Sequence, residues 1–199
     1  IYEGGRGSGK TMFFLCNSWK QRFQEIESQG ENTKILFESN SFVGIYYRAD
    51  APFIGSFYGK GIEDETWKSI FSTYFNVVIC KEIFRFLQNC LNLELLQETS
   101  LSDIYKLISR KLQSDYECSS IDSVNEVLDH VLDEIEFFAN DTKKIHPTLL
   151  SPGTLIKAVI EDLRSIECFK DTNFHIFVDE YETLSSYQQI HINTLIKMS

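Results

Sequence analysis

The chain has 199 residues, which is enough for one domain with a substantial core. Its hydrophobic fraction of 43% is typical of a folded globular protein and argues against disorder. The formal net charge of −10 argues against non-specific nucleic-acid binding except through a local basic patch or another domain. No apolar run approaches the ~20 residues that a membrane helix needs.

Glycines are concentrated at the start of the chain, in IYEGGRGSGKT. The spacing from Gly4 to Thr11 fits G-x-x-x-x-G-K-[ST], the phosphate-binding P-loop. Glycines allow successive backbone N–H groups to turn toward phosphate oxygens, and the following helix N-terminus adds more donors. We expect Lys10 to reach the β- and γ-phosphates and Thr11 to hold Mg²⁺. The predicted binding residues are Gly4, Gly5, Arg6, Gly7, Ser8, Gly9, Lys10 and Thr11.

The context of this motif supports a strand–loop–helix unit rather than an ordinary glycine-rich turn. Residues 1–3 suit the end of a strand, and residues 11–26 carry apolar side chains at helical spacing. Since Ile1 stands inside the expected strand with no initiator Met, we expect the chain to be part of a longer protein.

The middle of the chain alternates between strand-like and helical patterns. Residues 34–37 and 42–49 suit strands, and 50–61 suit a loop that packs under its own aromatic side chains. Helices are predicted over 65–92, 101–112, 121–138 and 154–169, and charged residues mark the 121–138 helix as solvated on one face.

Near the other end, a short apolar run, 174–178, leads into Asp179 and Glu180. Such a run suits a buried parallel strand, and its carboxyl end is the ligand side of an open α/β sheet. We expect Asp179 to contribute to the Mg²⁺ site and Glu180 to polarise an attacking water. An adjacent Asp-Glu pair favours an ATPase, so ATP and Mg²⁺ are the predicted cofactors, with Glu180 and Lys10 as catalytic residues.

These elements predict an α/β fold, with a P-loop NTPase core, a parallel sheet and a large helical insertion between the P-loop and the acidic strand. The predicted parts are the first part of the core at 1–61, the insertion at 62–150 and the second part of the core at 151–199.

The segments GGRGSGKT, GIYYRAD, TWKSIFSTYFN and FVDEYETLSSYQQIHINTLIK resemble a bacterial group of AAA+ ATPases related to origin-recognition proteins. The resemblance implies that Lys10 and Thr11 bind phosphate and Mg²⁺, that Asp179 binds Mg²⁺ and that Glu180 activates water. It also implies an ATP-driven conformational switch, in an oligomer, that serves DNA transactions or antiviral defence. The adenine pocket, the sensor strand and the arginine-bearing lid of the family are not found in this sequence.

Two other interpretations remain open at the level of sequence. Residues 150–153, Leu-Ser-Pro-Gly, resemble the signature loop of an ABC-type ATPase, in which Ser151 and Gly153 would contact a second subunit's nucleotide. Ser-Pro-Gly is also a common way to end one helix and begin another. Alternatively, the fold binds ATP as a slow, non-enzymatic signalling switch.

The remaining predictions concern partners and compartment. Self-association or a partner subunit is expected to supply an arginine in trans. The five cysteines are scattered and form no C-x-x-C pair, which suggests reduced thiols in the cytoplasm. Arg48, at the end of a predicted strand, is expected to face phosphate or a neighbour, or to pair with Asp50 or Asp179.

Overall fold

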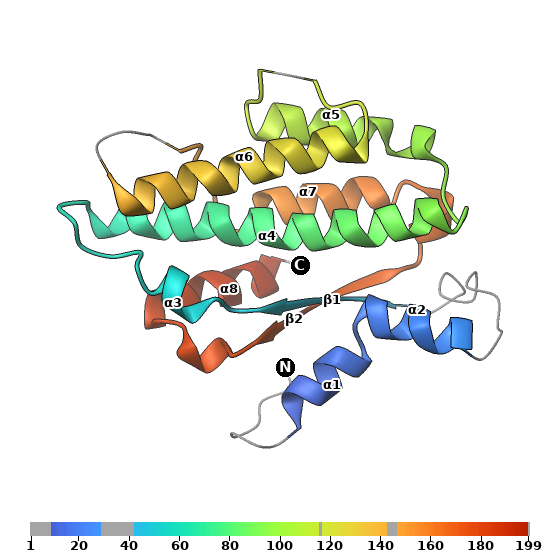
Figure 1. Cartoon of the computed structure of the whole chain (residues 1–199), viewed down its shortest axis with the longest axis horizontal. Coiled ribbons are helices and arrows are strands. Elements are labelled where there is room, and N and C mark those ends of the chain that lie inside the picture. The colour runs from blue at the N-terminus through green and yellow to red at the C-terminus, as the bar shows by residue number, and fades with distance from the viewer. Residues whose placement is uncertain (1–8, 29–41, 116, 143–146, 199) are drawn as a thin grey trace.

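The structure, a computed structural model, describes residues 9–28, 42–115, 117–142 and 147–198 (Figure 1). The predicted strands at 1–3 and 34–37, and the P-loop residues Gly4, Gly5, Arg6, Gly7 and Ser8, lie outside these ranges. The regular elements are α1 Lys10–Cys16, α2 Trp19–Ser28, β1 Phe42–Arg48, α3 Ala51–Ile54, α4 Asp64–Asn92, α5 Ser102–Lys111, α6 Ile121–Asn140, α7 Thr154–Leu163, β2 Asn173–Asp179 and α8 Ser186–Met198. Short 3-10 turns are also present among the described residues, namely η2 Glu98–Leu101, η3 Glu167–Phe169 and η4 Tyr181–Thr183.

The two strands of the described residues, β1 and β2, pair in parallel, as expected for an α/β fold. Their register runs from Phe42 opposite Asn173 to Arg48 opposite Asp179. Because side chains alternate along a strand, one face of the sheet carries Tyr46, Arg48 and Asp179 and the other carries Tyr47. Both strands therefore bring their carboxyl ends to the same edge of the sheet.

Helices cover both faces of this sheet. On one face, the ring of Phe14 in α1 stacks on Phe177 of β2, with ring centroids 5.2 Å apart. On the other face, Phe75 of α4 packs edge-on against Tyr47 of β1 at 5.6 Å. Figure 1 shows α4 between the sheet and α6, with α1 on the opposite side of the strands. The site-bearing strands are thus enclosed between α1 and a helical layer.

The sequence pattern predicts one continuous helix over 11–26, and this prediction is wrong. Helix α1 ends at Cys16 and α2 begins at Trp19, so Asn17 and Ser18 separate two helices. The Asn17 amide donates to the Phe13 carbonyl at 2.8 Å, and the Ser18 hydroxyl donates to the Leu15 carbonyl at 2.7 Å. Such local side-chain bonds compete with the helix ladder and favour an end at these residues. The break lets α2 turn toward α4, where Trp19 and Phe23 both contact Phe86.

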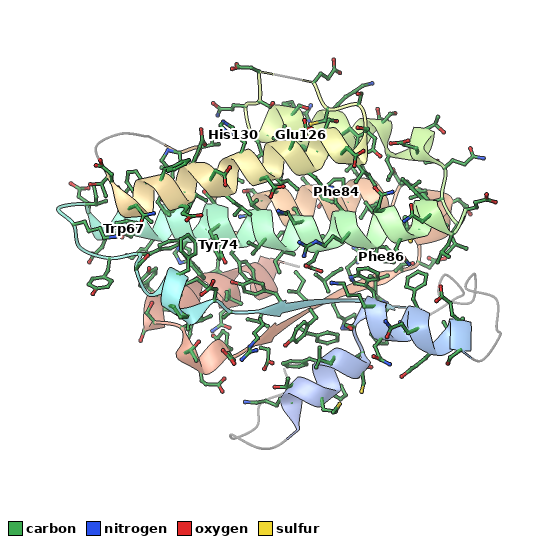
Figure 2. All side chains as sticks on the ribbon, in the orientation of Figure 1. Trp67, Tyr74, Phe84, Phe86, Glu126 and His130 are labelled. Carbon is green, nitrogen blue, oxygen red and sulfur yellow. The ribbon has the colours of Figure 1, made fainter. Side chains whose placement is uncertain are left out.

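Helix α4 is the centre of the hydrophobic core and confirms the prediction of a long buried helix. Figure 2 labels Trp67, Tyr74, Phe84 and Phe86 along it. The side chains of Trp67, Phe84 and Phe86 are at most 1% exposed. Burial of an apolar side chain of this size stabilises the fold by roughly 1.5–3 kcal/mol. One cluster of buried side chains joins α4 to the sheet and to α5, α6 and α7, so residues 62–150 share their core with the strands. Their status as an insertion remains a prediction.

Helix α6 carries the predicted solvated face. Its acidic residues on that face are all exposed, namely Asp122, Glu126, Asp129, Asp133 and Glu136. Figure 2 shows Glu126 and His130 on the side of α6 away from α4. The opposite stripe, with Val124, Leu128 and Ile135, is fully buried, as the amphipathic pattern predicted.

Two boundaries differ from the sequence prediction. The predicted loop at 50–61 contains the single turn α3, because the Asp50 carboxylate accepts from the Phe53 amide at 3.1 Å and caps it. The loop does pack under its own aromatics, since Phe53 lies 5.1 Å from Phe57, which is buried. The helix predicted over 154–169 ends at Leu163 and is followed by η3.

Candidate functional site

The described part of the predicted P-loop is its end, at the start of α1. Gly9 has a φ of +80°, in the left-handed region that favours glycine, and α1 begins at the next residue, Lys10. A Cβ atom at Gly9 would meet nothing within 4 Å. The backbone conformation, and not a lack of space, therefore favours glycine here.

Thr11, a predicted P-loop residue in the first turn of α1, contacts the end of the acidic strand β2. The Thr11 hydroxyl donates a hydrogen bond to Oδ1 of Asp179 at 3.1 Å, across 168 positions of sequence. Asp179 is the last residue of β2 and is 6% exposed, whereas Thr11 is exposed. The structure thus brings together the two residues that the sequence predicts to hold Mg²⁺.

The chemistry of this pair fits Mg²⁺. A hydroxyl oxygen and a carboxylate are hard oxygen donors, and Mg²⁺ usually adds water and nucleotide phosphate oxygens to one or two such ligands. Among the residues that the structure describes, no group of three His, Cys, Asp or Glu is placed to hold a metal by itself. A metal at Thr11 and Asp179 would add water and nucleotide oxygens to these two ligands. The metal role of both residues remains a prediction.

The Asp179 carboxylate is held by two further hydrogen bonds. The Tyr46 hydroxyl donates to Oδ2 at 3.0 Å, and the backbone amide of Glu180 donates to Oδ1 at 3.0 Å. Burial, followed by the bond to Asp179 and the charges of Asp179 and Glu180, raises the pKa of Tyr46 to about 12. Tyr46 is therefore a neutral donor at physiological pH.

Tyr46 is not among the site residues predicted from the sequence. The signal lies in the strand alternation, since Tyr46 and Arg48 are polar residues on one face at the carboxyl end of β1. That these side chains lie close to Asp179 becomes clear only when β1 is known to pair with β2 in this register.

Glu180 lies just beyond β2 in a left-handed conformation, with a φ of +58°. The Arg48 Nε donates to its Oε1 at 3.0 Å, and a second guanidinium nitrogen contacts the same oxygen. The hydrogen bond and the charge of Glu180 raise the pKa of Arg48 above its usual value. The predicted pairing of Arg48 with Asp50 or Asp179 is wrong, because the turn at Glu180 brings this carboxylate to the guanidinium.

A groove of about 580 Å³ adjoins the site at the edge of β1. Tyr46 and Arg48 line it, but Lys10, Thr11 and Asp179 do not. The other cationic side chains that line the groove form ion pairs within the protein. Lys20 and Arg85 both pair with Glu82, and Lys81 pairs with Asp129. Among the described residues of the predicted phosphate site, none lines the groove.

The loop at 150–153 is built as a helix start on the α4 side of the sheet. The Asn76 amide donates to the Ser151 carbonyl at 3.1 Å, and its Oδ1 accepts from the amides of Leu155 and Ile156 at 3.1 and 3.3 Å. Gly153 has a φ of +68° directly before α7. These contacts account for Leu-Ser-Pro-Gly as the start of α7.

The fold and the site together define the class of the protein. A parallel sheet with helices on both faces, and a glycine–lysine–threonine helix start against the carboxyl end of a strand, fit a P-loop-type α/β fold. A family model described as ORC-CDC6-like matches residues 1–199, so the chain belongs to the ORC-CDC6-like family. The resemblance to origin-recognition-type AAA+ ATPases is thereby confirmed.

Family membership indicates an ATPase in general and implies nucleotide binding, typically with Mg²⁺. No curated protein and no solved structure matches the chain. In the described ranges, no helix combines the length and the apolar character that crossing a membrane requires.

Proposed function

We propose that the site formed by Lys10, Thr11, Asp179 and Glu180 binds ATP with Mg²⁺ and hydrolyses it. The observation that carries this proposal is the 3.1 Å hydrogen bond from Thr11 to Asp179. The two residues come from distant parts of the chain and from separate motifs, and a P-loop ATPase needs both at one point.

Each residue has a distinct role in this proposal. Lys10 binds the β- and γ-phosphates and stabilises the charge that develops on the transferred phosphoryl group. Thr11 and Asp179 would hold Mg²⁺, which when bound neutralises phosphate charge. Glu180 orients and polarises the attacking water, once its carboxylate is free of Arg48.

A second candidate function, a slow ATP-binding switch, is favoured by one observation. The Glu180 carboxylate forms an ion pair with Arg48 in the present conformation, so the group that would polarise water is engaged elsewhere. In such a switch, binding free energy acts through differential affinity for two conformations, and turnover is low.

The wider setting of the proposal follows from the resemblance. ATP binding or hydrolysis would drive a conformational change in a larger bacterial protein, with an arginine supplied by self-association or by a partner subunit. Contact with nucleic acid would use other domains or a local patch, because the net charge of the chain is −10. DNA transactions and antiviral defence are the proposed settings.

The test is ATP binding and Mg²⁺-dependent hydrolysis by the longest available form of the protein, beside Lys10→Ala, Glu180→Gln and the control Glu182→Gln. Glu182 is exposed and lies two positions after Glu180, which makes it a matched carboxylate. We expect Lys10→Ala to lose binding. Glu180→Gln should bind normally and lose about 100-fold or more in turnover, and Glu182→Gln should behave as the parent.

The other outcomes decide between the two candidates. Binding without measurable hydrolysis by the parent protein would favour the slow switch. Absence of binding by the parent protein would reject both candidates, and equal losses in Glu180→Gln and Glu182→Gln would reject the role of Glu180.

A further inference from the structure

We propose that Tyr46 is a positioning residue for the Asp179 carboxylate, and that its hydroxyl supports the Mg²⁺-dependent part of nucleotide binding. This inference rests on the proposed function and adds a residue to the same site. It begins from the 3.0 Å hydrogen bond from the Tyr46 hydroxyl to Asp179 Oδ2.

The hydrogen bonds divide the two oxygens of Asp179 between different partners. Oδ1 accepts from Thr11 and from the Glu180 amide, which together use its two lone pairs. Oδ2 accepts from Tyr46 and retains one acceptor position. Rotation of the carboxylate about its Cβ–Cγ bond would break all of these bonds together. Among the contacts of the described residues, Oδ2 is thus the oxygen that retains an acceptor position, and the Tyr46 hydroxyl helps to fix it.

The strand register explains why a long side chain is needed at this position. Tyr46 lies opposite Phe177, two residues before Asp179 along β2. Two residues along a strand span roughly 6.6 Å, so the donor must extend well beyond its own register position. A phenol ring carries a hydroxyl over such a distance and loses little rotamer freedom.

The next residue, Tyr47, provides a matched control. Its side chain points to the opposite face of the sheet, where its hydroxyl lies 3.5 Å from the Tyr74 hydroxyl. Both tyrosines lie in β1, but only the hydroxyl of Tyr46 reaches Asp179. Removal of each hydroxyl in turn separates an effect on the site from a general effect on the strand.

The experiment measures the affinity of the longest available protein for ADP, with saturating Mg²⁺ and with EDTA, for the parent, Tyr46→Phe and Tyr47→Phe. We expect Tyr46→Phe to weaken ADP binding about tenfold in Mg²⁺ and to leave the affinity in EDTA unchanged, because a hydrogen bond to a charged acceptor is lost. Tyr47→Phe should match the parent in both conditions. Thermal unfolding of each variant establishes that it is folded at the assay temperature.

A double-mutant cycle with Asp179→Asn completes the test. If Tyr46 acts through Asp179, then Tyr46→Phe has no further effect on ADP affinity in the Asp179→Asn background. The proposal would be overturned if Tyr46→Phe bound ADP in Mg²⁺ as tightly as the parent. It would also be overturned if the variant lost the same ADP affinity with Mg²⁺ and with EDTA. Failure of the parent to bind ADP in either condition would instead reject the proposed function itself.

Discussion

At Gly44, one close contact affects both the packing of the fold and the geometry of the site. It lies in β1 on the face that carries Tyr46, and a Cβ atom there would overlap the Asn17 carbonyl oxygen and lie 2.6 Å from Cε2 of Phe177. A backbone carbonyl cannot rotate away as a side-chain end does. Gly44→Ala must therefore push the α1–α2 junction away from the sheet.

The loss of stability expected for Gly44→Ala follows from this geometry. Overpacking by one methyl group costs about 1–3 kcal/mol, and the rigid backbone contact places Gly44→Ala near 3 kcal/mol. For a chain of this size, a loss of about 3 kcal/mol lowers the melting temperature by roughly 6–12 °C. Because Thr11 lies on the displaced helix, its 3.1 Å contact with Asp179 should lengthen, and Mg²⁺-dependent nucleotide affinity should fall as well.

The control is Ile45→Val at the next position of β1. Ile45 is fully buried on the opposite face, and loss of one methylene there costs about 0.5–1.5 kcal/mol without moving α1. Thermal unfolding measures the loss of stability in each variant. ADP affinity, measured well below both melting temperatures, reports the effect on the site. If Gly44→Ala melted with the parent, or lost no more affinity than Ile45→Val, the argument from the Asn17 contact would be refuted.

Three further predictions concern stability, pH and turnover. Asn76→Ala should lower the free energy of unfolding by about 1–3 kcal/mol in urea denaturation, because the first-turn amides of α7 lose their buried acceptor. Burial lowers the pKa of His191 below its usual value of 6.5, so the folded state binds this proton less tightly than the unfolded chain. Stability should therefore fall as the pH falls below 6.5, and less steeply in His191→Asn; parallel pH profiles would contradict this. Arg48→Gln should raise the rate of ATP hydrolysis by releasing Glu180, with little change in stability, as is usual for exposed ion pairs. An unchanged rate would mean that the ion pair does not restrain turnover.

The main elements were predictable because each has a local signal. The apolar runs of β1 and β2 and the long apolar helix α4 appear where the sequence patterns place them. The proximity of Thr11 and Asp179 was also predictable, since P-loop side chains and the carboxyl ends of parallel strands meet at one edge of the sheet.

What could not be predicted depends on contacts between distant segments. The apolar spacing continues across Asn17 and Ser18, so periodicity alone gives one helix where the structure has two. The need for glycine at position 44 exists only because the Asn17 carbonyl approaches that strand. The roles of Tyr46 and Arg48 likewise require the register between β1 and β2, which no local pattern specifies.

The adjacent carboxylates of Asp179 and Glu180 illustrate how the backbone determines what two neighbouring residues can do. In a regular strand, Glu180 would point to the face opposite Asp179, toward α4. Its φ of +58° turns the chain instead, so that the carboxylate meets Arg48 on the Asp179 side of the sheet. A non-glycine residue in this conformation costs about 1–2 kcal/mol, more than an exposed ion pair usually returns.

A comparison of Glu180→Gly with Glu180→Ala isolates this strain, because both variants remove the carboxylate and only one relieves the left-handed conformation. We expect Glu180→Gly to unfold with a free energy about 1 kcal/mol higher than Glu180→Ala, somewhat offset by the greater freedom of glycine in the unfolded chain. Both should lose hydrolysis. Equal stabilities in urea denaturation would show that the turn is not strained. A more stable but inactive glycine variant would mean that the fold accepts local strain to bring a second carboxylate beside the predicted phosphate site.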